Sequence, residues 1–343
     1  MKQERIQNPS FVDRAVIESK IAEGFHVILQ FDKPAYYSPE LLKKINNLCG
    51  EFGEKLEVRF YGHYGTFFDA SALSNLTEIE SLSIDCLSDV SNLAALGDLK
   101  NLHCLSLGIC NLDDPHILQS LQLQKLESLS LGESLKANFD LAPLQSCFNL
   151  KKLFVVKHTK NIDLLPGLPV LQSLRLVSIP KKQRLDFVSK IKTLKRLVLI
   201  LGGRANISEI YHPNIEELEI LRVMGFDDID SINAFPSLCS LVIEDQIRLK
   251  RIRFTPTNNK IQSLRIFNCK TLQSLNGLEG LTELKSISVG MTALSVDSLL
   301  EQYLPRSLRT FAFYTGKAKE NEIIRKKLDA FGYTESAVGT PSL

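Results

Sequence analysis

Tryptophan is absent from this chain of 343 residues, and long apolar runs are absent too. The densest apolar run, residues 197–201, is far shorter than the roughly 20 residues that a membrane-spanning helix needs. The first residues lead into mixed polar sequence and lack the apolar segment of a signal peptide. We therefore expect a cytoplasmic protein with no membrane partner.

Neither sign of charge dominates, since 41 Lys and Arg residues oppose 39 Asp and Glu residues, for a net charge of +2. Proteins that bind nucleic acid through its phosphates usually carry a clearly basic face. The balanced charge therefore predicts no nucleic-acid partner, and it also argues against an acidic mimic of nucleic acid.

The cysteines are few, odd in number and scattered: there are seven, and none forms a C-x-x-C pair. A disulfide framework or a structural zinc site normally needs clustered, regularly spaced cysteines. The pattern favours free thiols in a reducing cytosol and predicts no metal site.

Catalytic motifs are missing as well, because the chain has no Walker loop, G-x-S-x-G, H-E-x-x-H or G-x-G-x-x-G. We predict no catalytic residue and no cofactor. One alternative from another class is a Cys-dependent enzyme that uses Cys104, which should point outward, whereas Cys110 and Cys269 should be inert in turns. Five widely spread histidines are expected on the surface or in turns: His63, His103, His116, His158 and His212.

What the chain does have is one motif many times over. Residues 194–199 read L-x-x-L-x-L, and copies recur every 21–24 residues. Such a period indicates a repeat architecture. The residue two positions beyond the fourth is also apolar in every copy. The fourth-position residues are Val58, Leu82, Leu105, Leu129, Leu153, Leu174, Leu197, Leu218, Leu241, Leu264, Ile287 and Phe311.

These copies resemble the leucine-rich repeat family, whose pattern is L-x-x-L-x-L-x-x-(Asn or Cys)-x-L. The resemblance runs from about Leu56 to Phe313, and the short repeats are similar to the bacterial class. It implies an α/β solenoid, in which a leucine-rich repeat arc of about 12 repeats carries a parallel β-sheet on its concave face between N- and C-terminal helical caps.

The Asn/Cys position is kept only by Cys110 and Cys269. In the family this side chain lies in a buried ladder that satisfies backbone groups of the turns, so we expect the ladder to be incomplete. The other copies hold Leu87, Ser134, His158, Ile179, Gly202, Val223, Gln246 and Thr292.

Three regions are predicted along the chain: 1–54 is an N-terminal helical cap with a diverged first repeat, 55–315 is the repeat array, and 316–343 is a C-terminal capping helix with a disordered tail. Residues 1–24 are expected to be helical, and 25–31 to form a strand. A second helix should begin at Ser38-Pro39 and end at Gly50, and a capping helix should cover 319–331 before a disordered tail from Thr334.

Alternation along each strand should turn the leucines inward and the intervening residues onto the concave sheet. The central column would then be Arg59, Ser83, Ser106, Ser130, Phe154, Arg175, Val198, Glu219, Val242, Arg265, Ser288 and Ala312. The next column would be Tyr61, Asp85, Gly108, Gly132, Val156, Val177, Ile200, Leu221, Glu244, Phe267, Gly290 and Tyr314.

Apolar residues gather in the middle of these columns, and charged ones lie among them. An apolar centre with charged neighbours is typical of a protein interface, in which Phe154, Phe267 and Arg175 would be anchors. The predicted partner-binding residues are Phe154, Val156, Arg175, Val177, Val198, Ile200, Glu219, Leu221, Arg222, Val242, Glu244, Arg265 and Phe267. Two other interpretations are burial against this chain or a second copy in a homodimer, and strand propensity without function.

The sequence thus predicts a non-enzymatic module that docks another protein on its concave face, as an inhibitor or immunity protein that masks a toxin or enzyme. The alternative is an adaptor or a secreted bacterial effector that recruits a host protein.

Overall fold

The computed structural model of the chain describes residues 2–63 and 66–334. The chain divides into two compact units, Met1–Leu171 and Gln172–Leu343, which are called unit 1 and unit 2 below.

The strands of unit 1 are β1 (Lys2–Gln7), β2 (Phe25–Phe31), β3 (Leu56–Tyr61), β4 (Phe68–Asp69), β5 (Ser81–Leu87), β6 (Val90–Ser91), β7 (Cys104–Ile109), β8 (Ser128–Leu131) and β9 (Lys152–Val156). Its helices are α1 (Arg14–Ala22) and α2 (Pro39–Phe52), with the 3-10 helices η1 (Pro34–Tyr36), η2 (Gly53–Lys55), η3 (Ala70–Asn75), η4 (Leu93–Asp98), η5 (Ile117–Ser120), η6 (Ala142–Ser146) and η7 (Ile162–Gly167). The main sheet is parallel and has the order β1-β2-β3-β5-β7-β8-β9.

The strands of unit 2 are β10 (Ser173–Val177), β11 (Arg196–Ile200), β12 (Glu217–Leu221), β13 (Ser240–Glu244), β14 (Arg251–Arg253), β15 (Ser263–Phe267), β16 (Ser274–Asn276), β17 (Ser286–Gly290) and β18 (Thr310–Tyr314). Its helices are α3 (Val296–Leu300) and α4 (Ala318–Ala330), with the 3-10 helices η8 (Asp186–Lys190), η9 (Asp230–Ala234), η10 (Pro256–Asn258) and η11 (Leu278–Gly280). The main sheet is again parallel, in the order β10-β11-β12-β13-β15-β17-β18.

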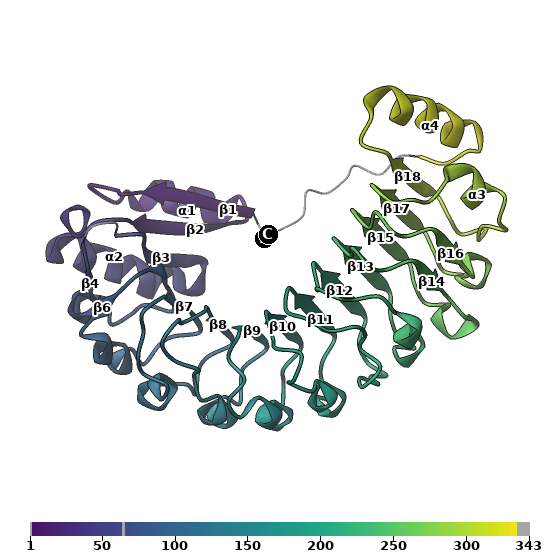
Figure 1. Ribbon diagram of the computed structural model, residues 1–343. Helices are drawn as coiled ribbons and strands as arrows, with labels where there is room; N and C mark the ends of the chain where they lie inside the picture. The colour runs from purple at the N-terminus through teal and green to yellow at the C-terminus, as the bar shows by residue number, and fades with distance from the viewer. Residues whose placement is uncertain (1, 64–65, 335–343) are drawn as a thin grey trace. The chain divides into compact units, whose positions relative to one another are not determined.

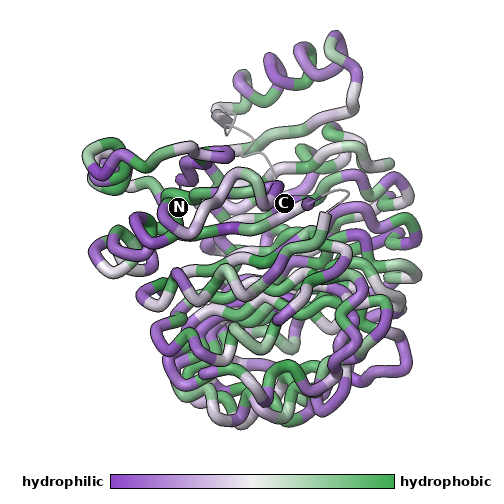
Figure 2. Tube along the Cα trace, turned by 90° about the vertical axis from the view of Figure 1, so that its left-hand side faces the viewer, coloured by the Kyte–Doolittle hydropathy of each residue, from purple (hydrophilic) through white to green (hydrophobic). Residues whose placement is uncertain are grey.

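The repeat prediction is confirmed residue by residue. All twelve fourth-position residues lie in strands of the two main sheets, and each is buried, as is the apolar residue two positions later. Hydrophilic and hydrophobic stretches alternate along the chain at short range (Figure 2). Burying one such side chain stabilises the fold by about 1.5–3 kcal/mol, so within each unit the stacked repeats stabilise one another.

Short 3-10 helices lie opposite the strands in the repeats of both units (Figure 1). Repeats of 21–24 residues leave little room for more than one helical turn on that side. Where a strand leads into its turn, the backbone often adopts positive φ at a residue other than glycine, for example at Lys157, Leu201 and Asp245. These positions bend the chain away from the sheet.

The N-terminal prediction is partly wrong. Residues 1–24 were expected to be helical, but Lys2–Gln7 forms β1, which pairs with β2, and only Arg14–Ala22 is helical. Backbone pairing holds this strand rather than burial, because its side chains are largely exposed. Helix α2 begins at Ser38-Pro39 as predicted, but it runs past Gly50 to Phe52.

The C-terminal cap is present but packs less tightly than expected. Helix α4 covers nearly the predicted range, yet of its expected apolar side Leu328 is buried while Ile323 is exposed, as is the following Phe331. Thr334 is not disordered, since it pairs with Thr310 beside β18. The rest of the predicted tail, 335–343, lies outside the described residues.

The turn ladder is more complete than the sequence predicted, and Cys110 is not part of it. His158 and Gln246 are buried at the ladder position and hydrogen-bond to backbone groups of neighbouring repeats, as does the thiol of Cys269. Cys110 is exposed, because a register shift between β5 and β7 places Ile109 in the core instead. Of the five histidines expected on the surface or in turns, His63, His158 and His212 lie in loops but are buried there.

Candidate protein-binding face

The side of each main sheet that points away from the core is called the open face. In unit 2 the strand register confirms both predicted columns: Arg175 pairs with Val198, and Val198 with Glu219, in the central one. In the next column Ile200 pairs with Leu221. Alternation therefore places all of these side chains on one surface, as the sequence predicted.

The apolar part of this surface is smaller than predicted. Val177 is only 8% exposed and Val198 only 1%, so neither offers the contact area that was expected. Val198 lies between the longer side chains of Arg175 and Glu219 on the adjacent strands, and Glu219 also forms a 2.5 Å ion pair with Arg196 of the strand that carries Val198. Long side chains shield a short β-branched neighbour in this arrangement.

Four apolar side chains remain half-exposed on the open face of unit 2: Ile200, Leu221, Val242 and Phe267. Phe267 stacks under the guanidinium of Arg265, whose carbon lies 5.9 Å from the ring centroid. These four residues are called the apolar row.

Several charged residues of the predicted site form ion pairs with residues of neighbouring repeats. Arg265 donates to Glu244 at 2.7 Å, and Arg222 donates to Asp245 at 2.8 Å. The pKa of the Arg175 guanidinium is lowered by burial and by the neighbouring Arg196, whereas Glu219 raises it. Partly exposed pairs contribute about 0–1 kcal/mol each, so their main effect is to keep the face close to neutral.

The structure adds three exposed apolar residues that the sequence analysis missed. Leu201 is 39% exposed, Met224 67% and Ile247 68%, and they follow β11, β12 and β13 respectively. They lie just beyond the carboxyl ends of three neighbouring strands and are called the apolar edge. The sequence could have revealed these residues, because each is an apolar residue in the turn that follows a strand. Turns of this kind normally favour Gly, Asn or Asp.

Phe154 and Val156 lie on β9 of unit 1 and are half-buried on its open face. Small side chains such as Ser106 and Ser130 lie in the same column as Phe154, and Arg59 lies at its N-terminal end, so this face differs in chemistry from the face of unit 2. The partner-binding role of every predicted residue stays a prediction.

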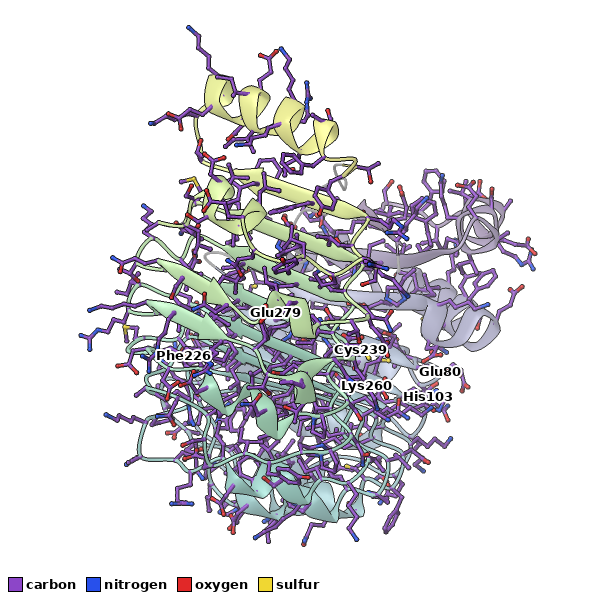
Figure 3. All side chains as sticks on the ribbon, turned by 90° about the vertical axis from the view of Figure 1, so that its right-hand side faces the viewer. Glu80, His103, Phe226, Cys239, Lys260 and Glu279 are labelled. Atoms are coloured by element: carbon purple, nitrogen blue, oxygen red, sulfur yellow. The ribbon has the colours of Figure 1, made fainter. Side chains whose placement is uncertain are left out.

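Cys104 does face outward, but its environment does not activate it. Burial, together with the nearby Glu54 and Glu57, raises the pKa of this thiol to about 11. A nucleophilic cysteine needs a lowered pKa and usually a neighbouring base. His103, next to it in sequence, pairs with Glu80 at 3.1 Å (Figure 3). A thiol of this kind stays protonated near neutral pH.

The described residues lack two further features. No helix in them is both long and apolar enough to cross a bilayer. No group of three or more His, Cys, Asp or Glu side chains within 2–63 and 66–334 is arranged to hold a metal ion.

No family model matches the chain, and no curated protein matches it. An internalin (InlF) from Listeria monocytogenes has a similar structure, with a TM-score of 0.51 and 19% identity over 85% of this chain and 80% of the internalin. A TLR13–ssRNA13 complex matches with a TM-score of 0.51 and 14% identity, over 91% of this chain and 50% of that chain. This chain thus spans about half the length of the TLR13 chain.

A leucine-rich repeat protein from Leptospira interrogans matches at 15% identity, with a TM-score of 0.46 over 96% of this chain and 93% of that one. The L-x-x-L-x-L copies, the buried leucines in parallel strands, the short 3-10 turns and the likeness to the internalin agree with one another. The chain is therefore a leucine-rich repeat protein in its fold.

Proposed function

We propose that this chain is a non-enzymatic docking module and that a partner protein with an apolar contact surface binds the open face of unit 2. The observation that carries the proposal is the combination of the apolar row with the apolar edge. Seven apolar side chains that the core does not use lie on neighbouring strands or just beyond their ends.

The shape and charge of this surface support a protein partner. Exposed contiguous apolar area on a monomer usually marks an interaction site. The ion pairs of Arg265 with Glu244 and of Arg222 with Asp245 lie beside the apolar residues, as polar rims lie beside apolar centres in protein interfaces. Hydrogen-bonded strands hold the face in place before binding, which lowers the ordering penalty of association.

The role that fits such a preformed surface is masking, so we propose that the chain acts as an inhibitor or immunity protein for a toxin or enzyme. An adaptor or effector that recruits its partner would use the same face. All seven cysteines are free thiols, which supports the proposal of a reducing, cytosolic location.

The experiment compares three forms of the full chain as bait for a candidate partner. The variant Ile200→Asp/Met224→Asp places a carboxylate in the apolar row and another in the apolar edge. Tyr211→Asp is the matched control, because Tyr211 is an exposed apolar residue outside the strands. We expect the double variant to lose one-to-one binding by at least tenfold, while the control binds like the wild type.

Sedimentation of the same three forms tests the homodimer. Concentration-dependent dimers that only the double variant abolishes would assign the face to a second copy. Equal partner binding by all three forms would overturn the proposal. If the partner is an enzyme, loss of its activity in the complex would support masking, and unchanged activity would support recruitment.

A further inference from the structure

The first strand of unit 1 leaves one side of its parallel sheet unpaired. β1 pairs with β2, and no other strand within residues 2–63 and 66–334 pairs with it (Figure 1). The other side of this six-residue strand is called the free edge of β1. Such an edge is a template for a further strand, and charged side chains such as those of Lys2, Glu4 and Arg5 restrict which strand can pair with it.

Three residues of β1 direct their backbone groups to the free edge. The N–H of Asn8 donates to the carbonyl oxygen of Gln30, next to β1 in the sheet, at 2.8 Å. Backbone groups of successive residues alternate between the two sides of a strand, so those of Gln3, Arg5 and Gln7 point away from β2. Each of these residues offers one donor and one acceptor to a strand laid beside β1.

An apolar hollow opens beneath the same strand. It has a volume of about 210 Å³ and is lined by Ile6 of β1, Leu29 of β2, Val16 and Ile17 of α1, and residues of the loop between β1 and α1. Phe11 of that loop is 72% exposed and Val16 is 49% exposed, so the hollow is open to solvent. A cavity of roughly 150 Å³ admits a benzene ring, so this hollow has room for a leucine or phenylalanine side chain.

The free edge and the hollow are placed to receive one extended segment together. Ile6 pairs with Leu29, and both side chains line the hollow. A strand added beside β1 would lie about 4.8 Å further out, and every second side chain of it would point to the same side as Ile6. In this mode of binding, main-chain hydrogen bonds supply affinity, and a pocket for alternate side chains supplies specificity.

We propose that the free edge of β1 docks an extended segment of another protein, which adds a strand to the sheet of unit 1 and places a leucine- or phenylalanine-sized side chain in the hollow. Charge complementarity specifies the neighbouring residues of that segment. Glu4 lies on the same side as Ile6, and its side chain makes no hydrogen bond or ion pair with the described residues. A lysine or arginine two residues from the apolar one would pair with Glu4.

The residue between these two would lie on the open face. There it would face Arg5, which is exposed and donates to the Gln3 side chain at 3.1 Å. An acidic residue at this position would pair with the Arg5 guanidinium. The segment that fits therefore alternates an apolar and a basic residue on one side with an acidic residue on the other.

A second copy of β1 is a worse match for this edge. In a two-fold dimer the edges pair in antiparallel orientation, with the residues that point outward opposite one another. The register that uses residues 3–7 places Arg5 opposite Arg5, and the one that uses 2–6 places Glu4 opposite Glu4. Like charges directly opposite each other destabilise paired strands. The remaining registers pair only 2–4 or 5–7, so the edge favours a different chain.

The test measures binding of a fluorescent heptapeptide to the full chain by anisotropy. The capped peptide Thr-Leu-Glu-Lys-Glu-Leu-Thr reads the same in both directions, so it suits a parallel or an antiparallel strand. Its lysine can lie opposite Glu4 while a glutamate faces Arg5 and a leucine enters the hollow. One matched peptide has serine in place of both leucines, and another carries methyl groups on its three central amide nitrogens. We expect each to bind at least tenfold more weakly.

Two variants at one position separate the backbone from the side chain. Arg5→Pro removes an N–H that points to the free edge and leaves the bonds to β2 in place, which edge strands tolerate. It should weaken binding of the heptapeptide at least tenfold. Arg5→Thr keeps the N–H and should weaken binding only about threefold, because an exposed ion pair contributes little.

A second pair of variants tests the hollow. Val16→Asp places a carboxylate at its mouth and should weaken binding of the heptapeptide at least tenfold. Leu135→Asp is the matched control, because Leu135 is an exposed apolar residue of unit 1 that does not line the hollow. It should bind the heptapeptide as the wild type does.

Each other result decides against the proposal. Equal binding of the methylated peptide would assign the hollow to an apolar ligand that needs no strand, and equal binding by Arg5→Pro and the wild type would remove the free edge. Concentration-dependent dimers that Arg5→Pro abolishes would assign the edge to a second copy. No binding at about 1 mM peptide would remove the site. The test is independent of the face on unit 2, since Ile200→Asp/Met224→Asp should bind the heptapeptide as the wild type does.

Discussion

His158 provides the sharpest test of how the turns of unit 1 are held. Its ring is buried, with Nε2 2.8 Å from the carbonyl oxygen of Gly132 and Nδ1 accepting the N–H of Phe139 at 3.0 Å. The ring also stacks on Phe139, with centroids 3.9 Å apart and planes 17° apart. One neutral imidazole therefore satisfies two backbone groups and packs against an aromatic ring.

The expected effect of His158→Ala follows from these contacts. A buried backbone group that loses its partner destabilises the fold by about 1–3 kcal/mol, and two groups are affected. Loss of the stacked ring pair removes roughly another 0.5–1.5 kcal/mol. Water entering the vacated space offsets part of this, so we expect a loss of about 3 kcal/mol in the free energy of unfolding.

Denaturant unfolding followed by circular dichroism measures this loss. His103→Ala is the control, because His103 makes a half-exposed pair with Glu80, which contributes about 0–1 kcal/mol. Hydrogen exchange should localise the effect of His158→Ala to amides near Phe139. If the two variants lose the same stability, the histidine does not act as a ladder residue and the reasoning is wrong.

The remaining predictions concern pH, one glycine and one strained residue. Burial lowers the pKa of His63, His158 and His212 in the folded chain, so the unfolded chain binds more protons. The free energy of unfolding should therefore be highest above about pH 6.5 and fall as the pH drops through the folded pKa values. Thermal melts from pH 8 to 5 measure this dependence. Gly132→Ala should destabilise by about 1–3 kcal/mol, because the new Cβ would lie 2.9 Å from the Cα of Gly108. Gly203→Ala is the control and should be tolerated, because its new Cβ would approach only the carbonyl oxygen of Met224, at 3.9 Å. Leu201→Asn should raise the free energy of unfolding by about 1 kcal/mol, because Leu201 adopts a left-handed φ of 57° that Asn tolerates better than Leu. The same change should weaken partner binding if the apolar edge takes part. A stabilised variant with unchanged binding would remove Leu201 from the site.

The repeat and the register could be predicted from the sequence because they rest on local periodicity. Each leucine needs only its neighbours in the next repeat to be buried, and a period of 21–24 residues brings them there. The column that runs through Arg175, Val198 and Glu219 followed from alternation along each strand alone.

Exposure of individual side chains could not be predicted in the same way. Val198 has the right parity for the open face, yet longer neighbours from adjacent strands cover it. Cys110 fits the family pattern, but a register shift moved Ile109 into its place. In both cases the outcome depends on residues 20 or more positions away in the chain.

The sequence by itself determined the repeat and which residues of each strand turn away from the core, because a period of two within strands and about 23 between them aligns equivalent residues of successive repeats. Its resemblance to the leucine-rich repeat motif added the fold. Only the tertiary structure decided which of those outward residues remain accessible, that His158 serves as a ladder residue, and that serines and glutamates of separate repeats surround Cys104. These features depend on side-chain length and ion pairing across strands, which no periodic pattern records.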